Sequence, residues 1–235
     1  MSAQELQSTA AALVAQGRGI LAADESTGTV GKRLASIGVE NTEGNRQAYR
    51  QLLFTSPEME SHISGVIMYD ETIRQSTDSG VSFGELLAAK GVMPGIKVDT
   101  GAKPLAGAPG ELVTEGLDGL RGRLEDYRGL GARFAKWRAV ITIGDGSPSL
   151  RCMEANAHAL ARYAALCQEA GIVPIVEPEV LMGGGHTIDR CEAVTRDTHR
   201  MVFAQLARCG VRWSIGNSAS SRLWSSCSAS RVTVS

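Results

Sequence analysis

Apolar, β-branched segments alternate with amphipathic segments along most of this chain, and this alternation constrains the fold more than any other feature. Five apolar segments predict strands, and three amphipathic segments between them predict helices. The predicted strands are residues 19–24, 65–70, 95–99, 134–140 and 173–180, and the predicted helices are residues 45–54, 119–130 and 149–170. Strands that alternate with helices in this way are typical of parallel βα units.

The spacing of these units indicates how many of them the chain holds. The first strand begins near residue 19 and the fifth near residue 173, so one unit takes about 38 residues, and eight units need about 300, as in a (β/α)8 barrel. With 235 residues, the chain is expected to hold about the first five units of a TIM (β/α)8 barrel. A doubly wound open sheet is the alternative, but it favours a GxGxxG loop where this chain has Asp24-Glu-Ser-Thr-Gly28.

Composition and charge exclude several classes of function. The chain has 24 Lys+Arg and 25 Asp+Glu, a formal net charge of −1, so it has no long-range attraction for nucleic acid or anionic lipid. It has no apolar run long enough to span a membrane and no basic segment followed by an apolar one at its start. Its histidines lack the spacing of metal ligands. We therefore expect a cytoplasmic globular protein without a metal site.

Six charged side chains fall where strands usually carry apolar residues. Lys136 and Arg138 are two positions apart, as are Glu177 and Glu179, so each pair shares one face of its strand. The other two charged residues are Asp24, which closes the first strand, and Lys97, which lies in the third. A buried charge without a partner costs several kcal/mol, so these groups must face one another or a charged ligand.

The position of these charges favours an active site. In a parallel barrel, inward side chains near the carboxyl ends of the strands converge at one mouth, where active sites lie. We therefore expect the six charges to share one cavity that binds an anionic substrate. Closely spaced carboxylates raise each other's pKa, and a lysine flanked by cations has a lowered pKa, which suits proton transfer. Structural ion pairs are the alternative, although barrel interiors consist mostly of Val, Ile and Leu.

The segment after the first strand has two interpretations. Thr27-Gly28-Thr29, followed by Lys32-Arg33, could begin a helix whose amino end holds a phosphate. The alternative is an ordinary capped helix start.

Several long motifs occur in order and cover about residues 5–210. They are Gly19-Ile-Leu-Ala-Ala-Asp-Glu-Ser-Thr-Gly28, Lys32-Arg-Leu-Ala-Ser-Ile-Gly38, Glu40-Asn-Thr-Glu43, Asn45-Arg46, Gly95-Ile-Lys-Val-Asp99, Pro104-Leu-Ala-Gly107, Gly116-Leu-Asp-Gly-Leu120, Phe134-Ala-Lys-Trp-Arg138 and Gly171-Ile-Val-Pro-Ile-Val-Glu-Pro-Glu179. With these motifs the chain resembles class I fructose-1,6-bisphosphate aldolases. The resemblance implies a TIM-barrel lyase that reversibly cleaves fructose 1,6-bisphosphate into dihydroxyacetone phosphate and glyceraldehyde 3-phosphate in glycolysis and gluconeogenesis. It also implies no cofactor, a cytoplasmic location and, in many members, a homotetramer.

The resemblance implies a catalytic role for four residues. In the family, a lysine amine attacks the ketose carbonyl, and the resulting iminium accepts electrons as the carbon–carbon bond breaks. By motif, Asp24 would orient the intermediate and take part in proton transfer near the C4 hydroxyl. Glu177 would be the general acid/base for Schiff-base formation, with Glu179 as its charged neighbour. Lys136 would assist the proton steps.

The resemblance implies a substrate-binding role for five more residues. Ser26, Thr29 and Lys97 correspond to positions near the C6 phosphate. Thr29 stands where the family is expected to have serine, so the hydroxyl is kept. Arg138 would lie beside Lys136, and Arg33 would be a further substrate-binding residue.

The chain departs from the family pattern after Gly210-Val211. There the family has a Leu-Glu-Gly segment and then a Leu-Lys-Pro-Asn-Met-Val stretch that supplies the Schiff-base lysine. This chain continues with Arg-Trp-Ser-Ile-Gly-Asn and has no lysine after Lys136. The serine–glycine loop and arginine of the C1-phosphate site and the C-terminal tyrosine are also absent. An inactive, truncated aldolase fragment without the Schiff-base lysine is therefore the alternative to an active enzyme.

The last 25 residues differ from the rest in composition. Residues 211–235 contain nine serines but no Asp, Glu or Lys, and they show neither strand nor helix periodicity. We therefore expect residues 1–210 to form a partial (β/α)8 aldolase barrel and residues 211–235 to be an aberrant Ser-rich tail. If residues 219–226 are encoded as GCC TCA AGC CGT CTA TGG TCA TCN, reading from the last base of each codon gives Leu-Lys-Pro-Ser-Met-Val-Ile. The tail is accordingly expected to be out of frame.

Overall fold

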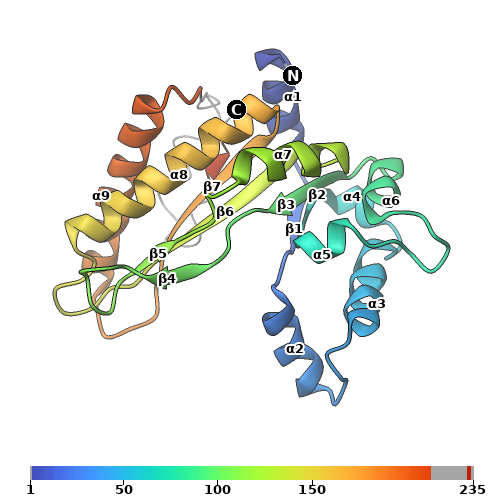
Figure 1. Cartoon of the computed structure of the whole chain (residues 1–235), viewed down its shortest axis with the longest axis horizontal. Helices are drawn as coiled ribbons and strands as arrows, with labels where there is room; N and C mark the ends of the chain where they lie inside the picture. The colour runs from blue at the N-terminus through green and yellow to red at the C-terminus, as the bar shows by residue number, and fades with distance from the viewer. Residues whose placement is uncertain (1, 213–231, 234–235) are drawn as a thin grey trace.

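Five parallel strands make up most of the main sheet of this protein, for which a computed structural model describes residues 2–212 and 232–233. The strands are β1 (Gly19–Ala23), β2 (Ile63–Met68), β3 (Met93–Lys97), β6 (Phe134–Ile141) and β7 (Val173–Val180). They are hydrogen-bonded in the order β1-β2-β3-β6-β7 and curl into a partial barrel (Figure 1). A doubly wound sheet would reverse its strand order at a switch point. The partial TIM barrel is therefore confirmed, and the doubly wound alternative is wrong.

The helices follow the predicted alternation. They are α1 (Ala3–Leu13), α2 (Thr27–Ser36), α3 (Glu43–Phe54), α4 (Met59–His62), α5 (Asp70–Ile73), α6 (Phe83–Ala89), α7 (Leu120–Gly129), α8 (Leu150–Ala170) and α9 (Ile188–Arg208). The three predicted helices correspond to α3, α7 and α8. The ends of α8 are those expected, because Ser149 accepts a hydrogen bond from the backbone of Cys152 and Gly171 adopts a left-handed φ of 72°.

The predicted strands all form, and two of them are shifted along the chain. The segments expected at residues 65–70 and 95–99 begin and end two residues earlier, as β2 and β3. A short hairpin of β4 (Ala102–Pro104) and β5 (Leu112–Thr114) was not predicted. Three-residue strands are too short to produce a readable alternation of side chains.

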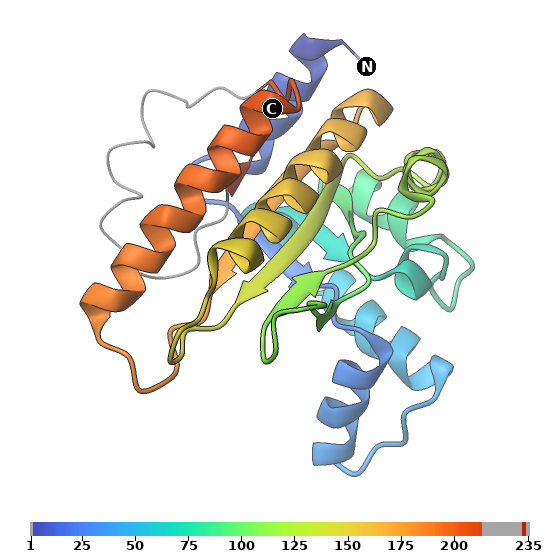
Figure 2. The ribbon, with the colours of Figure 1, turned by 60° about the vertical axis from the view of Figure 1, so that its left-hand side comes forward.

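The outer face of the sheet packs against helices. In β6, Ala135, Trp137 and Ala139 belong to one buried cluster with residues of α8 and α9. Figure 2 shows α8 lying along this face, with α9 beside it. The hydroxyl of Tyr163 in α8 donates to the backbone oxygen of Ala135 at 2.7 Å, which anchors the helix to the strand. The alternate residues of β6, including Lys136 and Arg138, consequently point to the inner face.

An apolar cluster covers the inner face toward the amino ends of its strands. There α1 packs Leu6, Ala10 and Leu13 into a cluster that includes the buried ring of Phe134. A Cβ atom added at Gly65 would lie 2.8 Å from this ring, so the ring fills the space beside a neighbouring strand. The α1 helix and the Phe134 ring thus close one end of the inner face. The charged residues lie two and four positions further along β6, toward the carboxyl ends of the strands.

The predicted tail, residues 211–235, is described only in part. Its first residue, Val211, is 5% exposed and belongs to the core cluster. The out-of-frame segment lies mostly in residues 213–231, outside the described residues. Val232–Thr233 form β8, antiparallel to β7, an element that the sequence did not predict. In the described part of the chain, no helix is long and apolar enough to cross a membrane.

Candidate active site

A buried lysine contacts two carboxylates on the inner face. Nζ of Lys136, in β6, lies 3.0 Å from Oδ2 of Asp24 and 3.3 Å from Oε2 of Glu177. These three residues are only 7%, 7% and 6% exposed, in the order Lys136, Asp24 and Glu177. Asp24 follows β1 and Glu177 lies in β7, which are the first and last of the five parallel strands. Their contact with one ammonium therefore shows that the curl of the sheet brings the strand ends together.

Arg138 and Glu179 form a second ion pair nearer to solvent. They lie two residues beyond Lys136 and Glu177 on the same strands, and Nε of Arg138 contacts the carboxylate of Glu179. Their side chains are 42% and 30% exposed. The hydrogen bond that the Arg138 guanidinium donates to Glu179 raises the pKa of Arg138, so the guanidinium stays charged. The spacing of two residues on each strand thus gives two ion pairs on the inner face. Lys136 with Glu177 is buried, and Arg138 with Glu179 is accessible to solvent.

Lys97 extends the site across β3. It lies opposite Lys136 in the parallel register of β3 and β6, so both side chains leave the same face of the sheet. Nζ of Lys97 donates to the backbone oxygen of Asp99 at 2.9 Å and also contacts the Asp99 carboxylate. Asp99 was absent from the predicted site. The spacing that singled out the other pairs could have found it, because Asp99 is two positions after Lys97 at the end of a strand.

The strand register and the curl of the sheet together place Lys136 between two carboxylates. The parallel register puts Glu177 next to β6, while the curl brings Asp24 to the other side. Each cation of the site faces at least one carboxylate. Lys97, Lys136 and Arg138 stand against Asp24, Asp99, Glu177 and Glu179, three cations against four carboxylates.

The segment after β1 forms the predicted helix start. Ser26 is the N-cap of α2, where its hydroxyl accepts from the backbone of Thr29 at 3.4 Å and lies 3.1 Å from the Thr29 hydroxyl. Arg33 is largely exposed and pairs with Glu25 at 2.7 Å. Figure 1 shows α2 extending away from the sheet. Within the described part of the chain, no hydrogen bond joins Ser26 or Thr29 to Lys97.

Arg50 fixes the segment that carries Asp24. It lies in α3, is 2% exposed, and donates to Oε2 of Glu25 at 2.5 Å and to the backbone oxygen of Glu25 at 3.1 Å. This buried pair ties α3 to the residue that follows Asp24. The sequence analysis missed it, because an arginine in an amphipathic helix looks like any solvent-facing residue.

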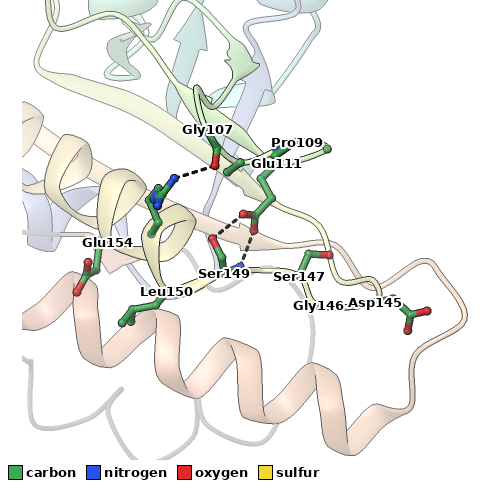
Figure 3. Close-up of a pocket in the computed structure, with 12 residues that line it drawn as sticks. Gly107, Pro109, Glu111, Asp145, Gly146, Ser147, Ser149, Leu150 and Glu154 are labelled. Atoms are coloured by element: carbon green, nitrogen blue, oxygen red, sulfur yellow. Dashed lines mark hydrogen bonds between the residues drawn. The ribbon is translucent and has the colours of Figure 1, made fainter.

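A cavity of about 800 Å³ lies away from these charges. It is lined by the turn between β4 and β5, the loop after β6 and the start of α8 (Figure 3). The Glu111 carboxylate accepts from the backbone nitrogen and the hydroxyl of Ser149, both at 2.5 Å. The predicted site residues do not line this cavity. In the described part of the chain, no group of histidine, cysteine or acidic side chains could hold a metal ion.

Comparisons with known proteins agree on one family. The family model described as fructose-bisphosphate aldolase class-I matches residues 5–215. A protein of Xanthomonas axonopodis pv. citri (strain 306), named "Probable fructose-bisphosphate aldolase class 1", is 64% identical over 206 residues, 88% of this chain and 62% of the relative. The cytosolic fructose-bisphosphate aldolase 7 of Arabidopsis thaliana is 56% identical over 86% of this chain and 56% of its own length.

A solved structure gives the same result. A fructose-bisphosphate aldolase from Plasmodium falciparum, solved with TRAP and a small-molecule inhibitor, superposes with a TM-score of 0.86 at 45% identity. The match covers 88% of this chain and 60% of that one. The chain thus spans less than two thirds of the length of each of these relatives.

Proposed function

The chain belongs to the class I fructose-bisphosphate aldolase family, and we propose that its inner face carries part of an active site for aldol cleavage. The substrate is fructose 1,6-bisphosphate, and the products are dihydroxyacetone phosphate and glyceraldehyde 3-phosphate. The reaction is reversible, uses no metal or other cofactor, and belongs to glycolysis and gluconeogenesis. One observation carries the proposal, the buried contact of Lys136 with Asp24 and Glu177 in a chain that matches this family over residues 5–215.

In this proposal, the buried cluster moves protons. Glu177 is the general acid/base for Schiff-base formation, and Glu179 is its charged neighbour. Asp24 orients the intermediate and takes part in proton transfer at the C4 hydroxyl. Lys136 lies between Asp24 and Glu177, within 3.3 Å of both, so its ammonium stabilises whichever carboxylate is charged during the proton steps.

The cations and hydroxyls around this cluster are proposed to bind the substrate. Ser26, Thr29 and Lys97 serve the C6 phosphate, and Arg138 and Arg33 bind the rest of the molecule. A phosphate monoester carries about −1.5 to −2 charges at pH 7, whereas Lys97, Arg138 and Arg33 already contact the carboxylates of Asp99, Glu179 and Glu25. We therefore expect weak binding, since the second phosphate would find no arginine or serine–glycine loop in this chain.

The second candidate function is binding without turnover. The chain has no lysine after Lys136, and the five lysines present are Lys32, Lys90, Lys97, Lys103 and Lys136. The family's nucleophile belongs to a Leu-Lys-Pro stretch of the sixth strand, which this sequence lacks. Loss of a covalent catalyst typically removes orders of magnitude of rate. We propose that a polypeptide of these 235 residues binds sugar bisphosphate and does not cleave it.

Two assays on the purified 235-residue chain test the proposal. The first follows cleavage of fructose 1,6-bisphosphate, and the second traps dihydroxyacetone phosphate with borohydride and measures the intact mass. We expect no cleavage and no added mass, while the Xanthomonas relative, run in parallel, shows both. Cleavage by this chain at the rate of the relative would overturn the binding-only proposal and leave the family assignment intact.

We further propose that residues 211–235 are read out of frame. Composition supports this, because residues 211–235 contain nine serines and no Asp, Glu or Lys, and a shifted frame can encode the family's Leu-Lys-Pro stretch. Sequencing the coding DNA from the codon of Gln205 onward tests it. The idea fails if the shifted frame contains no Leu-Lys-Pro.

The location and assembly of the protein are also proposals. Some relatives carry the word cytosolic in their names, and we propose that this protein is cytoplasmic as well. The homotetramer that the family resemblance implies remains a prediction, and light scattering on the purified chain would measure it.

A further inference from the structure

Asp99 is a buried carboxylate to which the proposed chemistry gives no role. Its side chain is 2% exposed, against 17% for its partner Lys97. Burial of a carboxylate to this extent costs several kcal/mol unless cations or hydrogen-bond donors contact it. Its position two residues after Lys97 puts it at the carboxyl end of β3, beside the charged cluster.

The two oxygens of Asp99 connect β3 with β6. Oδ1 contacts Nζ of Lys97 and accepts from the backbone nitrogen of Gly101 at 3.1 Å. Oδ2 accepts from the backbone nitrogen of Arg138 at 3.2 Å. The Asp99 carboxylate therefore contacts the side chain of Lys97 and the backbone of Arg138, two cations of the site.

The backbone around Asp99 is itself held in place. Arg123 donates to the backbone oxygen of Val98 at 3.0 Å and also contacts the backbone oxygen of Gly116. Gly116 has a φ of +132°, and a Cβ there would lie 3.1 Å from Cα of Asp99. Only glycine permits this close approach. The carboxylate thus projects from a segment that is fixed on both sides.

Asp99 is the acidic partner of a lysine that faces another lysine. Lys97 and Lys136 are opposite each other in the register of β3 and β6, and like charges in such positions repel. Lys136 has Asp24 and Glu177 as partners, whereas the contacts of Lys97 go to Asp99. An ammonium has three donors, and two of those of Lys97 point to the carboxylate and backbone oxygen of Asp99.

We propose that Asp99 is a positioning residue, which fixes the ammonium of Lys97 so that Lys97 directs its third N–H to a phosphate of the sugar bisphosphate. The inference rests on the proposed function for its ligand. The position of Lys97 itself does not depend on that function, so the two ideas can be tested separately.

The test uses Asp99→Asn, with Asp118→Asn as the matched control, because Asp118 is exposed and lies outside the site. Calorimetric titration with fructose 1,6-bisphosphate measures affinity. Trace acetylation followed by mass spectrometry measures the reactivity of Lys97 relative to the exposed Lys103. We expect Asp99→Asn to weaken binding about tenfold, as for a lost charged hydrogen bond, and to raise the relative acetylation of Lys97 severalfold. Asp118→Asn should leave both unchanged, and Asp99→Glu should restore part of each.

A purely structural role predicts different results. If folded Asp99→Asn keeps the wild-type acetylation of Lys97, the proposal is wrong, whatever the ligand affinity. If the wild-type chain binds no fructose 1,6-bisphosphate but the acetylation rises as expected, the positioning role stands and the proposed function fails.

A double variant covers the case in which Asp99→Asn does not fold. Asp99→Asn combined with Lys97→Gln removes both charges together, which leaves no buried charge without a partner. We expect this variant to bind with the affinity of Lys97→Gln alone. A much weaker affinity than that of Lys97→Gln would overturn the proposal, because Asp99 would then act through something other than Lys97.

Discussion

Replacement of Lys136 by methionine should destabilise the chain strongly. Its ammonium lies 3.0 Å from Asp24 and 3.3 Å from Glu177, and all three side chains are less than 10% exposed. Lys136→Met keeps most of the side-chain volume but leaves two buried carboxylates without their cation. Breaking a buried pair in this way costs about 3–5 kcal/mol, a large part of the 5–15 kcal/mol that typically separates folded from unfolded domains. Urea denaturation followed by circular dichroism measures this change as a lower midpoint at constant slope.

Two further variants separate charge from volume. Lys136→Met combined with Asp24→Asn and Glu177→Gln removes every charge of the cluster and should regain most of the lost stability. Arg121→Met breaks the exposed pair with Glu169, whose side chains are 63% and 57% exposed, and should cost less than about 1 kcal/mol. If Lys136→Met costs no more than Arg121→Met, Lys136 is not the buried partner of two charged groups, and the electrostatic argument for the site is refuted.

The other predictions concern pH and packing. Burial lowers the pKa of His199 below its ordinary 6.5, so below that pH the unfolded chain binds more protons than the folded one. The free energy of unfolding therefore has its full value above pH 6.5 and falls as the pH drops through the lowered pKa. His199→Gln should make the free energy of unfolding, measured by urea denaturation, depend less on pH. Gly95→Ala would overlap the ring of Phe134 and should cost about 1–3 kcal/mol. Gly122→Ala, in α7 with nothing near the added Cβ, should stabilise by about 0.5–1 kcal/mol in the same assay.

The sequence predicted the architecture well because each strand has a short-range signal. Apolar runs and the spacing of about 38 residues between them located all five parallel strands of the partial barrel. The same local rule put Lys136 with Arg138, and Glu177 with Glu179, on the inner face. The packing of Trp137 on the outer face agrees with that alternation.

The pairing of charges could not be predicted, because it depends on contacts distant in sequence. Asp24 meets Lys136 across 112 positions, and only the curl of the sheet brings them together. The cost of burying a charge required these groups to find partners, but the sequence did not indicate which carboxylates would contact Lys136. Burial is equally hard to predict, since Arg50 in α3 resembles an ordinary solvated residue until its partner Glu25 is known. The roles proposed for the site residues in catalysis and binding stay predictions.

Mapping the binding of fructose 1,6-bisphosphate by NMR tests the central claim most directly. In a titration of the 15N-labelled chain, we expect the amide shifts that change to cluster around Asp24, Lys97, Arg138 and Glu177, at the carboxyl ends of β1, β3, β6 and β7. Fructose at the same concentrations should change them far less, because it lacks phosphates. Shifts confined to the cavity near Ser149, or no saturable change in a folded chain, would contradict a sugar-bisphosphate site on the inner face.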